Sequence, residues 1–350
     1  MLAPVTHILP LTTIRKERFL PIPGKVLVRR GQKVSATDTI AEANLDPQHL
    51  LMDLVRGLGL PASKTDQYIQ VKEGDLVAEG DVLAGPVGFP KRLIRSPDNG
   101  RVILTGSGSI LLEVQGRPFE LKAALPGVVI ELMAERGAII ETTGALIQGV
   151  WGNGGIDFGL LNILAHLPDE ILTSDRLDFS LRGSMVLAGH IADQEVLKTA
   201  ADLPLRGLVI SSMHPSLIPL AKKMPFPLIV IEGFGHQPMN SAAFKLLSTS
   251  ERREVALNAE PWDRYAGTRP EVVIPLPASG EPPLPRDNDF FAPGQQVLVV
   301  RAPWSGKIGT LVALSGITVL PCGLRAQAAE VRLENGENVV LPLANLEILA

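Results

Sequence analysis

Between residues 23 and 160 the hydrophobic pattern consists of short apolar runs interrupted by glycine. Four stretches, which begin at Gly24, Val71, Gly100 and Pro126, share one order: valine, a glycine turn, valine, a polar turn, then isoleucine or leucine. Short β-branched runs with glycine at the turns are typical of strands. Because the spacing of the four stretches is irregular, the pattern predicts a region of small sheets and not a solenoid.

One stretch in this region has a different period. In DPQHLLMDLVRGLGL, residues 46–60, apolar side chains recur at helical spacing at Leu50, Leu51, Leu54, Val55 and Leu58. Asp46 followed by Pro47 has the form of a helix cap with proline in the first helical position. The pattern predicts a helix over 46–60.

From residue 184 the pattern alternates between strands and helices. The apolar runs SMVLAGH, RGLVISSM and FPLIVIEGFG are separated and followed by segments with helical spacing at 192–203, 215–224 and 240–250. Strand–helix alternation implies parallel pairing with right-handed crossovers. Continuous apolar strands favour a sheet that is covered on both faces. We therefore expect a small, parallel, Rossmann-like α/β domain.

The predicted fold class is multidomain and mainly β, with an α/β segment. The expected division is an N-terminal extension, a barrel-sandwich region, a connector, the α/β domain, a proline-rich linker and a C-terminal SH3-like barrel, at 1–22, 23–160, 161–183, 184–265, 266–293 and 294–350. The linker assignment depends on its many prolines, which favour extended backbone.

Composition narrows the possible functions. The net charge is −4, so a broad nucleic-acid-binding field is excluded. The single cysteine, Cys322, excludes an internal disulfide framework and a multi-cysteine zinc site. The first 23 residues lack a signal-peptide pattern, and the chain has no continuous apolar run long enough for a membrane span. We expect a cytoplasmic protein that does not enter the membrane.

Two neighbouring stretches carry a family resemblance, VKEGDLVAEGDVLA at 71–84 and SPDNGRV at 96–102. They resemble the biotinyl/lipoyl-like barrel-sandwich hybrid family. In carrier members a hairpin presents a modified lysine, and Lys91 is the nearby candidate. Its context, GFPKRLIRSP, lacks the lysine motif of carriers. The resemblance therefore implies a structural, non-carrier module without biotin or lipoate, of the kind found in RNA polymerase subunits, rotary ATPases and efflux adaptors.

The C-terminal stretch GQQVLVVRAPWSGKIGTLVAL, residues 294–314, resembles a KOW motif. The resemblance implies an SH3-like barrel, completed by a hairpin turn at Asn335–Gly336. In that family the loop between the first strands contacts RNA or protein in ribosomal proteins and transcription elongation factors. Arg301, Trp304 and Lys307 are the matching residues here. Protein docking and nucleic-acid contact both remain open.

A second group of candidates lies where the α/β strands end. Ligands of open α/β sheets bind beyond the carboxyl ends of the strands. The residues at these ends are His190, Ser211, Ser212, His214, Glu232, Gly233, Gly235 and His236, and the glycine-rich loop residues Gly152, Asn153 and Gly154 are added to them. This set is compatible with anion binding, acid–base chemistry or a histidine metal site, but no G-x-S-x-G elbow, Walker A or HExxH motif is present. For the loop itself, a structural hinge is favoured over a ligand-binding role.

These observations favour a non-catalytic binding or assembly factor that docks on a larger complex, with the transcription or translation machinery as the partner suggested by the KOW resemblance. The alternative is a small-molecule sensor or an enzyme with its site at the α/β strand ends. A biotin or lipoate carrier is the least favoured reading.

Overall fold

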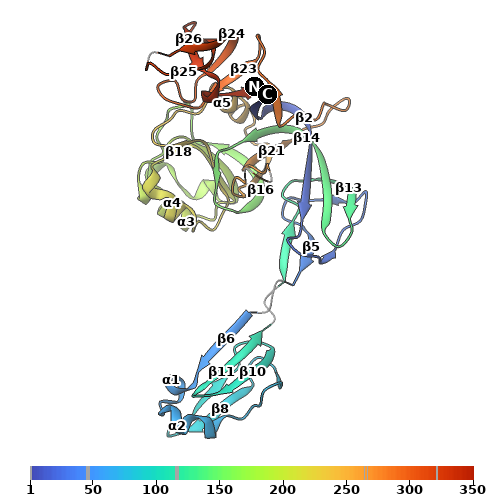
Figure 1. Cartoon of the computed structure of the whole chain (residues 1–350), viewed down its shortest axis with the longest axis vertical. Coiled ribbons are helices and arrows are strands. Elements are labelled where there is room, and N and C mark those ends of the chain that lie inside the picture. Colours follow the sequence, from blue (N-terminus) through green and yellow to red (C-terminus); the bar gives the residue numbers. More distant parts are fainter. Residues whose placement is uncertain (1, 45–47, 115–117, 264, 266, 321) are drawn as a thin grey trace.

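The computed structural model describes the whole chain except residues 1, 45–47, 115–117, 264, 266 and 321. The protein is mainly β, with several sheets and few helices, as the sequence predicts. Figure 1 shows three parts along the long axis: a separate unit at one end, a small unit in the middle, and a head that contains both chain termini.

The distal unit, residues 48–114, is formed by a four-stranded sheet and a hairpin. The sheet has the order β6-β11-β10-β7, and β8 pairs with β9. The elements are β6 (Gln48–Asp53), α1 (Leu54–Leu58), α2 (Ala62–Thr65), η1 (Asp66–Tyr68), β7 (Leu76–Val77), β8 (Val82–Val87), β9 (Arg92–Arg95), β10 (Gly100–Gly106) and β11 (Ser109–Val114). Its own core is built from residues of this segment alone, including Leu58, Leu83, Val102 and Leu112.

The helix predicted over 46–60 is wrong for most of its length. Residues 48–53 form the strand β6, which pairs with β11, and the helix α1 is limited to five residues. The leucine-rich run is compatible with the helical period and with the strand period. In the structure it follows the strand period: Leu50 and Met52 pack toward the core, and Leu51 faces outward. Asp53 is the actual cap, since its side chain accepts from the backbone N–H of Arg56. The predicted cap at Asp46 and Pro47 lies outside the described residues.

The middle unit is formed by two segments that flank the distal unit in the sequence. It contains β3 (Lys25–Val26), β4 (Lys33–Val34), β5 (Thr39–Ala43), β12 (Phe119–Lys122) and β13 (Gly127–Met133). Two long strands, β2 (Ile8–Phe19) and β14 (Gly137–Gln148), pair antiparallel along most of their length and extend from this unit into the head. Gly137 permits this pairing, because a Cβ there would lie 1.9 Å from the carbonyl oxygen of Arg18.

The α/β unit, residues 149–275, has the predicted parallel core. β16 (Ile156–Ile163), β17 (Ser184–Ala188), β18 (Gly207–Met213) and β19 (Leu228–Phe234) are parallel neighbours in an eleven-stranded sheet. The same sheet contains β15 (Trp151–Gly152), β20 (Glu254–Asn258) and β21 (Glu271–Pro275), and also strands of the middle unit. The proline-rich segment 266–293 thus contributes strand β21 to this sheet.

Helices cover both faces of the parallel strands, as expected. On one face Val186 and Ile210 pack with residues of α3 (Gln194–Asp202) and α4 (Ile218–Ala221). On the other face Val209 and Ile229 pack with residues of α5 (Ser241–Ser248). The side chain of Asn240 caps α5 by accepting from the backbone N–H of Ala243. Three short 3-10 turns complete the unit, η2 (Ser174–Arg176), η3 (Phe179–Leu181) and η4 (Pro215–Leu217).

The C-terminal unit is a seven-stranded sheet with the order β22-β1-β27-β23-β24-β25-β26. Its elements are β1 (Leu2–Thr6), β22 (Asn288–Phe290), β23 (Gln296–Val299), β24 (Ile308–Val319), β25 (Arg325–Leu333), β26 (Asn338–Pro342), η5 (Leu343–Asn345) and β27 (Leu346–Leu349). The expected hairpin turn at Asn335–Gly336 joins β25 to β26, with Gly336 at a φ of 86°.

The first residues of the chain are an integral part of this sheet. β1 pairs parallel with β27 and antiparallel with β22, and β2 continues into the middle unit. The segment 1–22, expected as an extension, thus connects the C-terminal unit to the rest of the molecule. In the part of the chain that the structure describes, no helix combines the length and apolar character that crossing a membrane requires.

Candidate functional site

Four of the predicted strand-end residues meet at the carboxyl ends of β17, β18 and β19. His190 Nδ1 lies 2.9 Å from Ser212 Oγ, and the rings of His190 and His236 are 4.8 Å apart between centroids. The hydroxyl of Ser211 lies 3.4 Å from that of Ser212. His190 and both serines are buried, whereas His236 is exposed and donates from Nε2 toward the carbonyl of Asp169.

The hydrogen bonds of this cluster give it a structural role. Ser212 Oγ donates to the carbonyl of Gln237 at 2.7 Å and accepts from the N–H of Gln237 at 3.0 Å. Because the single hydroxyl proton is used in this way, His190 must donate from Nδ1. Burial, and secondarily the charge of His236, lower the pKa of His190 and favour the neutral ring. A serine that is buried and already makes three hydrogen bonds is poorly placed to attack a substrate, so the cluster holds the loop after β19 in position.

The other predicted strand-end residues play local roles. His214 is exposed and accepts from Ser216 at the start of η4. Gly233 near the end of β19 and Gly235 in the turn that follows it adopt φ angles of 133° and 91°. Within the described residues, no three histidine, cysteine, aspartate or glutamate side chains are arranged to hold a metal ion.

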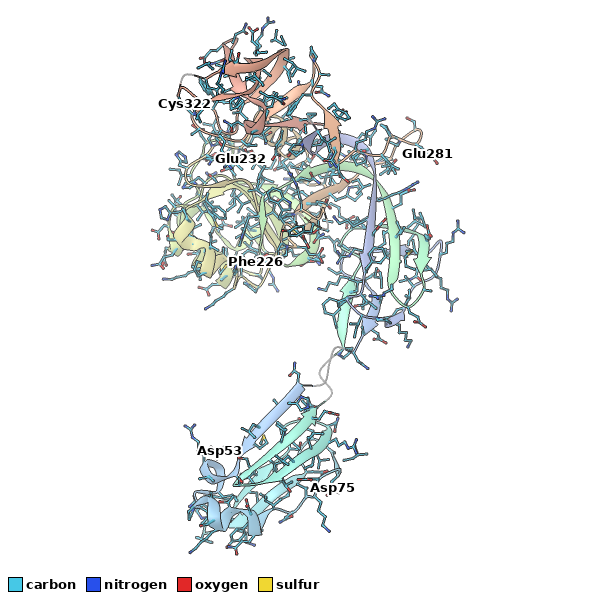
Figure 2. All side chains as sticks on the ribbon, in the orientation of Figure 1. Asp53, Asp75, Phe226, Glu232, Glu281 and Cys322 are labelled. Atoms are coloured by element: carbon cyan, nitrogen blue, oxygen red, sulfur yellow. The ribbon has the colours of Figure 1, made fainter. Side chains whose placement is uncertain are left out.

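The structure separates the glycine-rich loop from the strand-end residues. Because β15 runs antiparallel to β19, Gly152–Gly154 lie at the amino end of β19. The side chain of Asn153 donates to the carbonyl of Phe226 at 2.8 Å and accepts from the N–H of Leu228 at 2.9 Å. Figure 2 shows Phe226 far from Glu232, which lies at the other end of the strand beside the C-terminal unit. Asn153 thus closes the turn before β19.

Glu232 is the strand-end residue with an unusual environment. Its Oε1 accepts from both the backbone N–H and the side-chain amide of Asn240, at 2.8 and 2.6 Å. Burial raises the pKa of Glu232 to about 7, against the opposing effect of these two hydrogen bonds. A Cβ built on Gly306 would lie 3.4 Å from Oε2, so this oxygen faces the C-terminal unit.

A cavity of about 260 Å³, here called the interunit cavity, lies between the α/β unit and the C-terminal unit. Two residues that the sequence assigned to different sites, Glu232 and Arg301, both line it. Beside it Ser305 Oγ donates to Gln237 Oε1 at 3.4 Å, and Ser241 Oγ donates to Glu334 at 2.6 Å. The loop that the KOW resemblance assigned to an external partner therefore packs partly on this chain. Trp304 packs against the core of the C-terminal unit, and Lys307 remains exposed.

The remaining charged lining of the interunit cavity was not predicted from the sequence. Arg269 Nη1 donates to Thr6 Oγ1 at 2.9 Å and lies 3.6 Å from Glu347, which also accepts from Thr6. The guanidinium of Arg269 covers the ring of Trp262 at 4.4 Å. These residues come from segments far apart in the chain, so no local motif could have placed them together.

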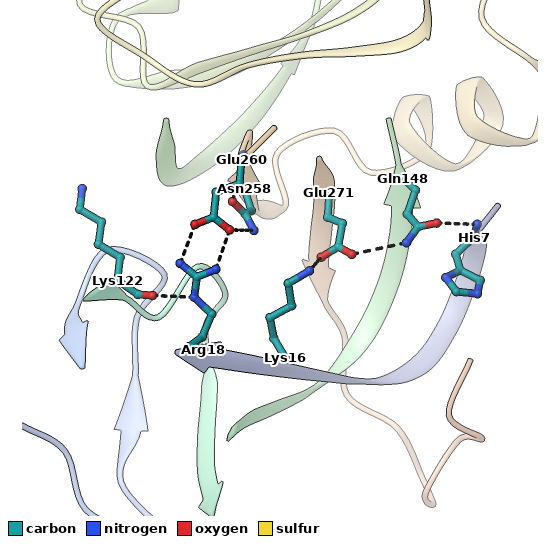
Figure 3. A network of polar contacts seen from close by, with 8 residues as sticks. All are labelled: His7, Lys16, Arg18, Lys122, Gln148, Asn258, Glu260 and Glu271. Carbon is teal, nitrogen blue, oxygen red and sulfur yellow. Dashed lines mark hydrogen bonds and ion pairs between the residues drawn. The ribbon is translucent and has the colours of Figure 1, made fainter. Parts of the chain in front are cut away.

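A second polar network joins β2 to the segments at Glu260 and β21 (Figure 3). Arg18 is buried and donates to both carboxylate oxygens of Glu260, at 2.5 and 2.7 Å. Burial alone would raise the pKa of Glu260, but the hydrogen bonds and charge of Arg18 lower it. Lys16 donates to Glu271 at 2.7 Å. These pairs join the middle unit to the α/β unit.

The outer face of the distal sheet carries a row of leucines. Leu51, Leu111 and Leu104 are direct partners on the neighbouring strands β6, β11 and β10. Leu51 and Leu104 are 71% and 57% exposed. Lys91 is also exposed, in the turn between β8 and β9. Together these residues make the distal unit a second candidate surface.

No family model matches the chain, and a search of curated proteins finds no match either.

Proposed function

We propose that this chain is a non-catalytic binding or assembly protein that docks on a larger complex through the outer face of its distal unit. The observation that carries the proposal is the leucine row formed by Leu51, Leu111 and Leu104. An antiparallel sheet with one face in water normally carries polar residues on that face. Burying an exposed leucine against a partner recovers about 1.5–3 kcal/mol, so the row provides a substantial driving force for docking.

The surroundings of the leucine row favour a protein partner. The distal unit contains seven basic and eight acidic residues, so it has no basic field that would attract nucleic acid. A polar row lies beside the leucines, where His49 Nε2 is 3.8 Å from Glu113 and Glu113 pairs with Arg101 across the strands. A recess of about 400 Å³ lined by Leu76, Arg101 and Glu113 adjoins this row. An apolar centre with a polar rim is typical of protein interfaces.

The architecture supports the same proposal. The strands of the distal unit pair only with each other among the described sheets, and Figure 1 shows the unit standing clear of the head. Barrel-sandwich and KOW-type modules, which the sequence resembles, serve as docking parts of transcription and translation machines. We propose a cytoplasmic complex of that kind as the partner, and a Rossmann-like fold for the α/β unit that supports the docking modules.

The test is affinity capture of the full chain from its native host, with quantitative mass spectrometry of the bound proteins. The double variant L51S/L104S is compared with L167S/L324S, which changes two similarly exposed leucines in the head. We expect a defined set of proteins to be lost from the first variant and retained by the second, with or without nuclease. Equal retention by both variants would overturn the proposal, and thermal melts would show that both variants are folded.

A further inference from the structure

The interunit cavity lies where ligands of α/β sheets usually bind. Glu232 belongs to the carboxyl-terminal end of β19, and ligands of open α/β sheets bind beyond that edge of the strands. Here the C-terminal unit covers this edge and provides the opposite wall through Val299, Arg301 and Ser305. The cavity volume of about 260 Å³ lies just below the roughly 300–1,000 Å³ of pockets for drug-sized ligands, so it suits a small metabolite.

Four charged side chains line this cavity, and they differ in how they are paired. Arg269 and Glu347 interact with each other and with Thr6. By contrast, among the described residues no hydrogen bond or ion pair engages Arg301, and none reaches Oε2 of Glu232. A guanidinium provides a planar pair of donors that matches a carboxylate or a phosphate. The unpaired groups are therefore one cation and one carboxyl oxygen.

From these observations we propose that the interunit cavity binds a small organic anion, a carboxylate or phosphate ester that also carries a hydroxyl or amino group. Arg301 binds the anionic group of this ligand from the C-terminal unit. Glu232 Oε2 forms a hydrogen bond with the hydroxyl or amino group from the α/β unit. Asn240 holds the carboxyl group of Glu232 in place through Oε1, so that the other oxygen is directed to the ligand.

The charge balance supports an anion over a cation. Arg269 and Glu347 compensate each other, and Asn240 and Thr6 are neutral. The pKa of Glu232 near 7 leaves this carboxyl largely protonated in mildly acidic solution. Arg301 then gives the cavity a net positive charge. As Glu232 ionises above pH 7, it repels an anion whose second group is an uncharged hydroxyl, so the affinity for such a ligand falls with rising pH.

The proposal is tested by calorimetric titration of the full chain with inorganic phosphate, lactate, malate, serine and glycerol 3-phosphate, and with the uncharged analogues glycerol and lactamide. We expect at least one anionic compound to bind while its uncharged analogue does not. The variant R301A is expected to lose at least tenfold in affinity, while R325A, which changes an exposed arginine of β25 outside the cavity lining, retains it. A preference for phosphate esters or for carboxylates would identify which anion the site selects.

Two further readouts use the best-binding hydroxylated probe whose own charge is constant between pH 6 and 8, such as lactate or malate. In the wild type, affinity is expected to fall between pH 6 and 8, and in E232Q it is expected to stay constant. Bound ligand is also expected to slow hydrogen exchange in the loop 300–307, because the anion bridges the two units. The proposal is overturned if no probe binds at millimolar concentration, or if R301A binds as tightly as the wild type.

Discussion

The distal unit and the C-terminal unit, which lie at opposite ends of the elongated molecule, differ in how they are attached to the rest of the chain. The distal unit has its own core, its strands pair among themselves, and the leucine row on its outer sheet faces solvent. The C-terminal unit takes strand β1 from the start of the chain, and its loop at 300–307 contacts the α/β unit. The leucine row of the distal unit is therefore free to contact a partner, whereas part of the loop at 300–307 is covered by this chain. The rest of the chain thus decides which surface of a unit is free.

The largest expected effect comes from weakening the core of the distal unit and the core of the C-terminal unit in separate variants. Leu112 and Leu311 are both fully buried, one in the distal core and one in the C-terminal core. Either leucine-to-alanine change is expected to cost about 2–5 kcal/mol. We expect Leu112→Ala to accelerate hydrogen exchange in residues 48–114 alone. Leu311→Ala should also affect β1 and the α/β residues that contact the C-terminal unit. Global acceleration by Leu112→Ala would contradict the independence of the distal unit.

The attachment of the middle unit provides the next test. Replacing Arg18 by alanine leaves the carboxylate of Glu260 without its partner, and we expect a loss of about 3 kcal/mol in unfolding free energy. Arg15→Ala, at an exposed ion pair on the same strand, serves as the control and should cost less than about 1 kcal/mol. Denaturant melts measure both variants. Equal losses of unfolding free energy in the two variants would show that the buried pair at Arg18 stabilises the fold no more than the exposed pair at Arg15.

The pH dependence of stability tests the contact between the head units. The pKa of Glu232 is about 7 in the folded protein and ordinarily 4.5. A raised carboxyl pKa means that the folded state binds more protons, so the contribution of Glu232 to stability is fully present below pH 4.5 and is lost as pH rises through 7. The loss corresponds to up to about 3 kcal/mol. We expect E232Q to remove this dependence and to be the more stable protein at pH 8. Parallel melting curves for both proteins from pH 5 to 8 would contradict this account.

The smallest effect concerns the short helix of the distal unit. Asp53 accepts from the N–H of Arg56 at 2.9 Å, and Asp53→Ala is expected to cost about 1 kcal/mol. Asp53→Asn, which retains an accepting oxygen, should cost a few tenths. Thermal melts distinguish the two variants. No difference between them would show that the cap at Asp53 is unimportant.

The sequence predicted those elements whose signal is local. The segments from 184 to 250 alternate in period, and parallel strands with helices on both faces are present there. The stretch 46–60 was misread because its leucines satisfy helical and strand periods together. The pairing of β1 with β27 joins opposite ends of the chain and has no local signal. For the same reason the sequence does not predict that Glu232, Arg269 and Arg301 line one cavity. It indicates Glu232 only by its position after a strand, and Arg301 only by its position in a loop.

The comparison between the two terminal units is tested most directly by a photo-crosslinking residue placed in the full chain at Leu51 or at Ser305. Expressed in the native host, the protein labelled at Leu51 is expected to crosslink to other proteins. The protein labelled at Ser305 is expected to crosslink within the chain, near Gln237. The reverse result, external crosslinks from Ser305 and none from Leu51, would contradict the claim that the distal unit provides the docking surface.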